Sequence, residues 1–161
     1  MAKVYISLGT NLGDKEQNLR AAIMQIEALC GKVEQTSSIY GSAPWGFESF
    51  NNFLNQVVLI ETLLSPKELM HTLLEIEKEL GRNRNHLSGY QDRIIDLDIL
   101  FYGNQIINEE WLVIPHPKLQ ERNFVLKPLL EINPNFIHPS INKSIFEIAD
   151  SSKDSTKAYK K

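Results

Sequence analysis

Residues 94–101 contain two aspartates in a segment that is otherwise apolar, IIDLDILF. The alternation predicts a β-strand, with every second side chain from Ile95 to Phe101 on one face. Asp96 and Asp98 then share the other face, about 7 Å apart. Because aspartate is uncommon in strands and like charges on one face repel, this pair favours a bound cation such as Mg²⁺, or a phosphate site. The alternative is a solvent-facing strand whose aspartates pair with lysines elsewhere.

The composition excludes several classes of protein. The 161 residues are 42% hydrophobic and 23% charged, which fits a single domain over residues 1–161 with its own core. A net charge of −3 argues against general nucleic-acid binding. Neither a membrane-length apolar run nor a signal-peptide pattern is present, and a single cysteine fits a reducing cytoplasm, so we expect a cytoplasmic protein. The sequence shows no obvious interface stripe, so a monomer is the default. The single cysteine, Cys30, excludes an internal disulfide and is expected in the core.

The periodicity predicts strands alternating with two amphipathic helices. Strands are expected over residues 3–9, 33–40 and 53–62, and helices over 15–30 and 66–80. Asp14 and Ser65 are expected to cap the helices at their start, and Gly31 and Gly81 to end them. Residues 152–161 are rich in lysine and are expected to form a flexible tail.

Cationic residues flank the aspartate strand. The connection over residues 82–92 is polar and basic, and Arg82, Arg84 and Arg93 bracket it. Arginines beside two metal-binding carboxylates are typical of a polyphosphate site, whereas the alternative is a solvated basic loop. Further along the chain, His116 lies between two prolines and Arg122 follows it, a pair that suits an anion better than a metal.

A second set of residues suits a flat ring. The loop over residues 41–52 combines turn residues with Trp45 and other aromatics, which favours a binding surface for a heterocycle. Asn55 stands in an apolar strand next to Phe53, and its amide could read the polar edge of such a ring. Alternatively, the aromatics close the edge of the core and the amide bonds to nearby backbone.

These motifs together resemble one family, 6-hydroxymethyl-7,8-dihydropterin pyrophosphokinase of folate synthesis. The resemblance covers roughly residues 3–139. The matching stretches are YISLGTNLGD at 5–14, FLN at 53–55, GRNR at 81–84, RIIDLDIL at 93–100, VIPHP at 113–117 and ERNFVL at 121–126. It implies an α+β, ferredoxin-like sandwich with a mainly antiparallel sheet and packed helices. It also implies a Mg²⁺-dependent transfer of pyrophosphate from ATP to the pterin hydroxymethyl group, with AMP as the leaving group.

The resemblance also assigns roles to residues. Asp96 and Asp98 should bind two Mg²⁺ ions that bridge ATP and the pterin hydroxyl, and Arg82 and Arg93 should favour the transfer itself. The expected contacts of the nucleotide and its phosphates are Glu77, Arg84, Ile99, His116 and Arg122. The expected contacts of the pterin are Ser42, Ala43, Trp45, Phe53, Asn55 and Phe124, with the two phenylalanines stacking on the ring.

Two positions depart from the family pattern. Many members carry Arg-Trp-Gly-Pro-Arg before the aspartates, whereas this chain has SGYQDR over residues 88–93, where Tyr90 could replace the tryptophan. Trp111 stands where some members carry an arginine. Two other functions stay open from the residues alone: another Mg²⁺-dependent phosphotransferase, and a non-catalytic ferredoxin-like module that stacks RNA bases on sheet aromatics.

Overall fold

The computed structural model describes residues 1–42, 53–81, 94–154 and 158–161. The elements, in chain order, are β1 (Ala2–Thr10), α1 (Lys15–Leu29), β2 (Gly31–Thr36), β3 (Tyr40–Ser42), β4 (Leu54–Thr62), α2 (Pro66–Gly81), β5 (Asp96–Tyr102), β6 (Ile107–Glu109), β7 (Leu112–Ile114), a 3-10 helix (Leu119–Glu121), α3 (Asn123–Ile132), α4 (Ile145–Asp150) and β8 (Ala158–Lys160). Among the described residues, no helix is both long and apolar enough to cross a membrane.

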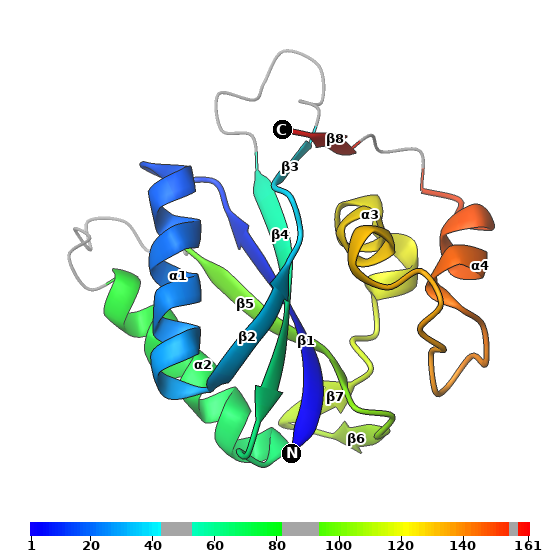
Figure 1. Ribbon diagram of the computed structural model, residues 1–161, viewed down its shortest axis with the longest axis horizontal. Coiled ribbons are helices and arrows are strands. Elements are labelled where there is room, and N and C mark those ends of the chain that lie inside the picture. The colour runs from blue at the N-terminus through cyan, green and yellow to red at the C-terminus, as the bar shows by residue number, and fades with distance from the viewer. Residues whose placement is uncertain (43–52, 82–93, 155–157) are drawn as a thin grey trace.

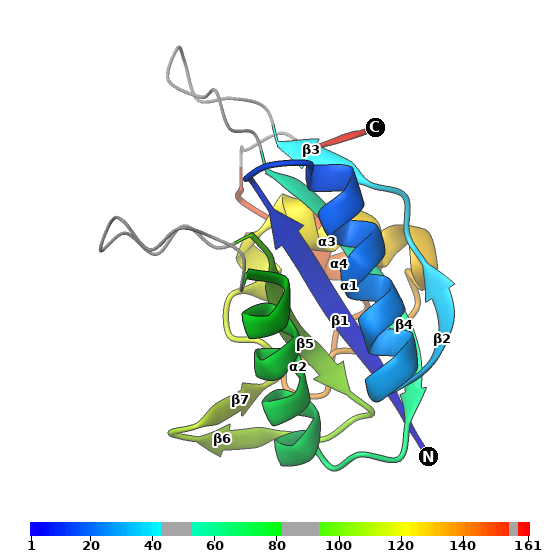
Figure 2. The same ribbon diagram turned by 90° about the vertical axis from the view of Figure 1, so that its left-hand side faces the viewer.

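One antiparallel sheet organises the molecule. Its strand order is β5-β1-β4-β3-β8, and β2 also pairs with β4, while β6 and β7 form a separate hairpin. Helices α1 and α2 cover one face of the sheet, and α3 and α4 lie on the other (Figures 1 and 2). This arrangement confirms the expected α+β sandwich.

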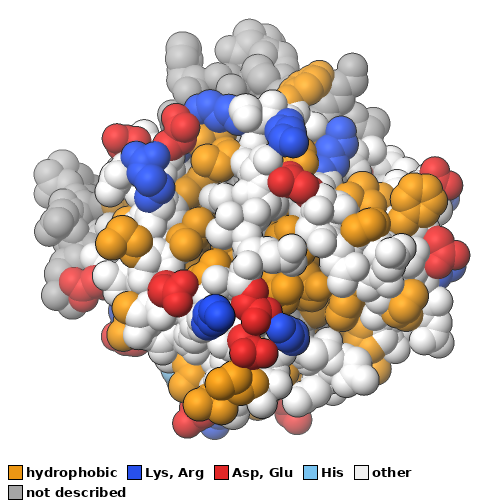
Figure 3. Space-filling view, viewed as in Figure 1, with side chains coloured by type: hydrophobic (Ala, Val, Ile, Leu, Met, Phe, Trp, Pro, Cys, Tyr) orange, Lys and Arg blue, Asp and Glu red, His pale blue; other side chains and the backbone are white. Residues whose placement is uncertain are grey.

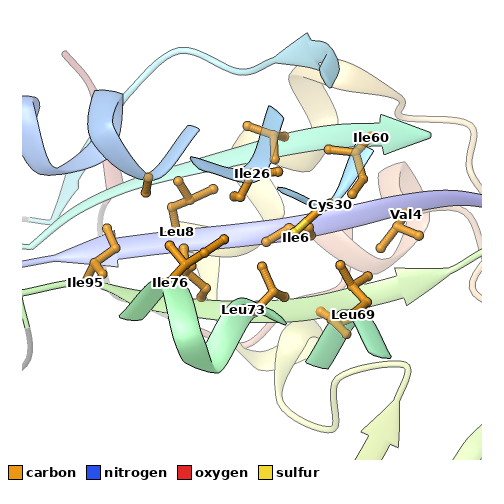
Figure 4. Packing of buried hydrophobic residues seen from close by; sticks show 14 of the residues in the cluster. Val4, Ile6, Leu8, Ile26, Cys30, Ile60, Leu69, Leu73, Ile76 and Ile95 are labelled. Carbon is orange, nitrogen blue, oxygen red and sulfur yellow. The ribbon is translucent and has the colours of Figure 1, made fainter. Parts of the chain in front are cut away.

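The face beneath α1 and α2 is closed by apolar packing. Ile6 and Leu8 of β1 meet Ile26 of α1 and Leu73 of α2, all at most 3% exposed (Figure 4). The helix ends agree with the sequence: Asp14 accepts the Gln17 N–H, and Ser65 and Glu68 form a reciprocal capping box. Gly31 is required after α1, since a Cβ there would lie 2.2 Å from the Glu61 carbonyl oxygen.

The opposite face has a second core, and a bulge in β5 corrects one prediction. Tyr5 of β1 pairs with Phe101, but Ile6 pairs with Ile99, so Leu100 is an extra residue in β5. The side chains beyond it change sides. Phe101 therefore packs in the core beneath α3 and α4, not with Leu97 and Ile99 as the simple alternation predicted.

The end of the chain also differs from expectation. Residues 152–161 were expected to form a flexible tail, but Ala158–Lys160 forms β8 and pairs with β3 along the edge of the sheet (Figure 1). The Lys161 N–H extends this pairing by donating to the Ile39 carbonyl. The prediction of a tail is therefore wrong for residues 158–160.

Candidate active site

The sheet register brings the predicted site residues into two rows. Gly9 of β1 lies between Asn55 of β4 and Asp96 of β5, and Ser7 lies between Val57 and Asp98. Both rows face the side of the sheet that carries α3. Val57 belongs to the second core, and beside it a pocket of about 350 Å³ opens over the other residues of the two rows. It is lined by Ser7, Leu8, Gly9, Phe53, Asn55, Asp96, Asp98, Arg122, Phe124 and Val125.

The two aspartates share the pocket, as the sequence predicted. Their strand is held from behind by α2, because the Glu77 carboxylate accepts the N–H of Leu97, the residue between them, at 2.7 Å. In the described part of the chain, no group of three or more His, Cys, Asp and Glu side chains is placed to hold a metal ion. Two carboxylates nevertheless fit Mg²⁺, which protein sites commonly bind through one or two carboxylates together with substrate phosphates.

His116 adjoins this pair. Its Nε2 lies 4.0 Å from an Asp98 carboxylate oxygen, while its Nδ1 accepts the Lys118 N–H at 3.1 Å. A neutral ring that accepts at Nδ1 carries its proton on Nε2, so His116 directs an N–H toward Asp98. Burial lowers the pKa of His116, and the charges of Arg122 and Lys118 lower it further, although Asp98 acts in the opposite direction. The lowered pKa favours the neutral ring of His116 at neutral pH.

Two aromatic rings and one cation line the pocket. Phe53 precedes β4 and is 43% exposed, and Phe124 is the second residue of α3. The Arg122 guanidinium lies 5.5 Å from the centre of the Phe124 ring, a cation–π distance. Because the first residues of α3 supply both groups, one helix start provides an apolar surface and a positive charge.

Asn55 is a polar residue that is buried within the sheet. Its side chain is 6% exposed, and its Nδ2 finds no hydrogen-bond partner among the described residues. A buried donor without a partner costs about 1–3 kcal/mol, so this amide is suited to a ligand that supplies an acceptor. Gly9 keeps the space beside it open, because a Cβ there would lie 3.0 Å from Asn55 Oδ1. Gly9 lies at the end of the strand expected over residues 3–9, and a glycine inside a strand is the sequence signal for a close approach of this kind.

A larger hollow of about 490 Å³ lies elsewhere, between the 3-10 helix and the segment after α4. Glu121, Lys143 and Ser151 are among its lining residues. It contains neither the aspartate pair nor the aromatic rings. Chemistry rather than size therefore identifies the β5 pocket as the candidate site.

The other predicted site residues lie outside this pocket or outside the described residues. Ile99 is 5% exposed and packs in the core beneath α1 and α2, so its side chain is not available to a nucleotide. Ser42 ends β3, the strand beside Asn55 in the sheet. The following predicted site residues lie outside the described residues: Ala43, Trp45, Arg82, Arg84 and Arg93, together with Tyr90 of the altered segment. Trp111 lies on the β6–β7 hairpin, where the Lys67 ammonium is 5.4 Å from its ring centre.

Solved structures with this fold come from longer proteins. The chain is similar to wild-type Plasmodium falciparum HPPK-DHPS with pteroate, with a TM-score of 0.75 and 17% identity. A second HPPK-DHPS structure, in complex with substrates, gives a TM-score of 0.70 and 16% identity. The matches cover 92% and 93% of this chain but only 44% and 43% of those chains. At this identity the likeness supports the fold.

Sequence comparisons identify the family. A pyrophosphokinase of Aquifex aeolicus, 2-amino-4-hydroxy-6-hydroxymethyldihydropteridine pyrophosphokinase, is 43% identical over 91% of this chain and 90% of its own length. The Bacillus subtilis protein of the same name is 45% identical over 80% of this chain and 76% of its own length. The model of the family 7,8-dihydro-6-hydroxymethylpterin-pyrophosphokinase (HPPK) matches residues 5–134. The chain therefore belongs to the HPPK family.

Proposed function

We propose that the β5 pocket is the active site at which this enzyme transfers pyrophosphate from ATP to 6-hydroxymethyl-7,8-dihydropterin in folate biosynthesis. The pterin hydroxymethyl oxygen forms a bond to the β-phosphorus, the bond from that phosphorus to the α-phosphate breaks, and AMP leaves. The observation that carries the proposal is the shared pocket: two carboxylates, two aromatic rings and a buried unpartnered amide meet there in a chain of the HPPK family.

The pterin side of the pocket consists of Phe53, Phe124 and Asn55. Aromatic side chains gain from stacking on a flat heterocycle, and the second residue of α3 and the residue before β4 supply one ring each. The Asn55 amide lacks a partner, and the pterin edge offers donors and acceptors that would satisfy it. Ser42, Ala43 and Trp45 stay proposals for further pterin contacts.

The phosphate side consists of Asp96, Asp98, His116 and Arg122. The two carboxylates would hold two Mg²⁺ ions, which when bound supply positive charge to the phosphate oxygens and orient the reactants. Arg122 adds a fixed positive charge within the same pocket. The Nε2 proton of His116 is directed to the Asp98 side, where it can stabilise the negative charge of that carboxylate or donate to a phosphate oxygen.

The remaining sequence assignments complete the proposal. Arg82 and Arg93 would stabilise the charge that develops during transfer, and Arg84 would contact the nucleotide. Glu77 stays a proposal for a contact near the nucleotide, and its hydrogen bond to Leu97 also holds the aspartate strand. We expect a monomeric enzyme that acts in the cytoplasm.

The identity of the nucleotide product tests this function. Purified protein with ATP, Mg²⁺ and the hydroxymethyl dihydropterin should form AMP and the pterin diphosphate in equal amounts, and omission of Mg²⁺ should abolish both. Formation of ADP would instead show a phosphotransferase that moves a single phosphoryl group. RNA binding without Mg²⁺-dependent ATP binding would support the non-catalytic module.

A further inference from the structure

The last residues of the chain contact both sides of the pterin pocket. We use the name C-terminal strap for Asp154 together with residues 158–161. The family match ends at residue 134, so the strap lies beyond the part of the chain that the family model covers. Its contacts are specific ones, made by a carboxylate at one end and by a paired strand at the other.

Asp154 binds the start of α3. Its carboxylate accepts the backbone N–H of Asn123 at 2.8 Å, and its own carbonyl accepts the Asn123 side-chain N–H at 3.0 Å. Arg122 at the helix start provides no side-chain cap, so the charge of Asp154 meets the positive end of the helix. Asn123 stands between Arg122 and Phe124, the two residues that α3 places in the pocket. Fixing Asn123 therefore fixes the position of both neighbours.

The other end of the strap pairs with β3. Register places Tyr159 opposite Gly41, and Lys161 donates its N–H to Ile39. Lys161 also forms an ion pair with Glu16 at 3.1 Å. Lys, Arg, Asp and Glu side chains lie together at several places on this face of the molecule (Figure 3). Because β8 lies on its outer side, β3 is paired along both edges. On the inner side Tyr40 pairs with Asn55, so β3 forms the flank of the pterin site.

We propose that the C-terminal strap is a positioning device for the pterin subsite, with Asp154 as its principal positioning residue. Asp154 binds the start of the helix that carries Phe124, residues 158–160 pair with the strand that flanks Asn55, and β8 itself packs against α3. Holding both sides at a fixed separation reduces the ordering that the pterin must otherwise cause when it binds. The inference rests on the proposed function, because it concerns the pterin affinity of the same pocket.

Two full-length variants test the two ends of the strap. Asp154→Ala removes the carboxylate at α3 and should weaken pterin binding about tenfold, the scale of one lost charged hydrogen bond. Tyr159→Pro removes the N–H that the register directs at Gly41 and should weaken it about threefold to tenfold. Binding of the dihydropterin is measured with a non-hydrolysable ATP analogue and Mg²⁺, and backbone hydrogen exchange is measured without ligands.

Matched controls separate this role from general loss of structure. Asp150→Ala removes an exposed carboxylate of α4, and Lys160→Pro removes an N–H that the register directs away from β3. Neither control should change pterin affinity, and all four proteins should unfold cooperatively. In the test variants, exchange should speed up in the first turn of α3 for Asp154→Ala and in β3 for Tyr159→Pro.

Wild-type pterin affinity together with wild-type exchange in both test variants would overturn the proposal. Faster exchange with unchanged pterin affinity would overturn it as well, because the strap would then be structural only. If the wild-type protein formed no AMP, the proposed function would fail instead. The exchange measurement would still show whether the strap holds α3 and β3, so the two failures are distinguishable.

Discussion

The two faces of the sheet are built from the same strands but differ in how far helices cover them. Beneath α1 and α2, buried apolar side chains follow one another along the strands, from Val4 to Leu8 along β1. On the other face, α3 and α4 cover Tyr5 and its neighbours, whereas Ser7 and Gly9 lie in an open pocket. One face is therefore a complete core, and the other is half core and half binding site.

This difference explains why polar residues stand in the middle of strands. On the closed face an aspartate would lose its water without a partner, at a cost of several kcal/mol. On the open face Asp96 and Asp98 keep access to solvent, and Asp98 is exposed. Substitutions on the closed face should therefore change stability, and substitutions in the pocket should change activity. Four predictions test that division, in order of decreasing effect.

Asp98→Ala should have the largest effect. We expect kcat to fall by about 10³-fold or more, because loss of a metal ligand removes charge stabilisation that is needed in the transition state. The free energy of unfolding should not fall, since the change relieves repulsion with Asp96 across one strand face. AMP formation and urea unfolding measure the two quantities. Asp98→Asn is the matched control for side-chain size, and a fully active Asp98→Ala enzyme would contradict the metal assignment.

Leu73→Ala tests the closed face. Leu73 of α2 is 3% exposed in the core, so truncation should lower the free energy of unfolding by about 2–4 kcal/mol through lost burial and a residual cavity. Per folded molecule, kcat and both KM values should stay within about twofold. Leu73 does not line the pocket, so its core contacts contribute little to binding of the substrates or of the transition state. The exposed Leu74→Ala is a matched control on the same helix, and it should change stability far less. A large loss of activity at full folding would show that the two faces are coupled.

Asn55→Leu tests the open face at a buried amide. The pterin KM should rise about 10- to 100-fold, because the ring edge loses its partner, while the KM for ATP changes little. The free energy of unfolding should hold or increase, since an amide with an unpartnered donor is replaced by an apolar side chain of similar size. Gly9→Ala gives an independent comparison, as its Cβ would press on Asn55 Oδ1 from the neighbouring strand. Normal pterin affinity in both variants would remove Asn55 from the site.

Local sequence was sufficient where a single strand or helix decides the outcome. Alternation placed Asp96 and Asp98 together on one face of β5, and both side chains line the pocket. The capping residues Asp14 and Ser65 could be predicted because each cap involves only a few consecutive residues. These features need no knowledge of the rest of the chain.

Features that depend on partners distant in the chain could not be predicted from the local sequence. The extra residue in β5 follows from its pairing with Tyr5 and Ile6, so the local alternation of β5 placed Phe101 on the wrong face. β8 pairs with a strand more than a hundred residues away in the chain, and its lysines suggest only a solvated tail. The need for Gly9 appears only once Asn55 lies beside it. Each of these is a tertiary contact that overrides a local pattern.

Glu131→Gln should have the smallest effect, and it tests how the rim of the open face is held. The Glu131 carboxylate of α3 accepts hydrogen bonds from the Ser38 N–H and hydroxyl and from the Tyr40 hydroxyl, which ties α3 to the start of β3. Burial opposes ionisation, but these hydrogen bonds outweigh it and lower the pKa of Glu131. Burial, followed by the hydrogen bond to Glu131 and then by the Glu131 charge, raises the pKa of Tyr40 to about 12.

The pH dependence of this variant follows from the sign of the shift. A carboxyl whose pKa is lower in the folded state stabilises the fold above its unfolded pKa, and this stabilisation disappears as the pH falls through the folded pKa. At neutral pH we expect Glu131→Gln to lower the free energy of unfolding by about 1 kcal/mol, a small value because solvent screens this exposed group. The deficit relative to wild type should shrink toward zero as the pH falls through the folded pKa of Glu131, which lies below 4.5, while the exposed Glu110→Gln should show no deficit at neutral or acid pH. Urea unfolding at the two pH values measures it. A deficit that persisted in acid would mean that the geometry of the contact, not the charge, holds α3 at the rim, and the open face would then depend on packing as the closed face does.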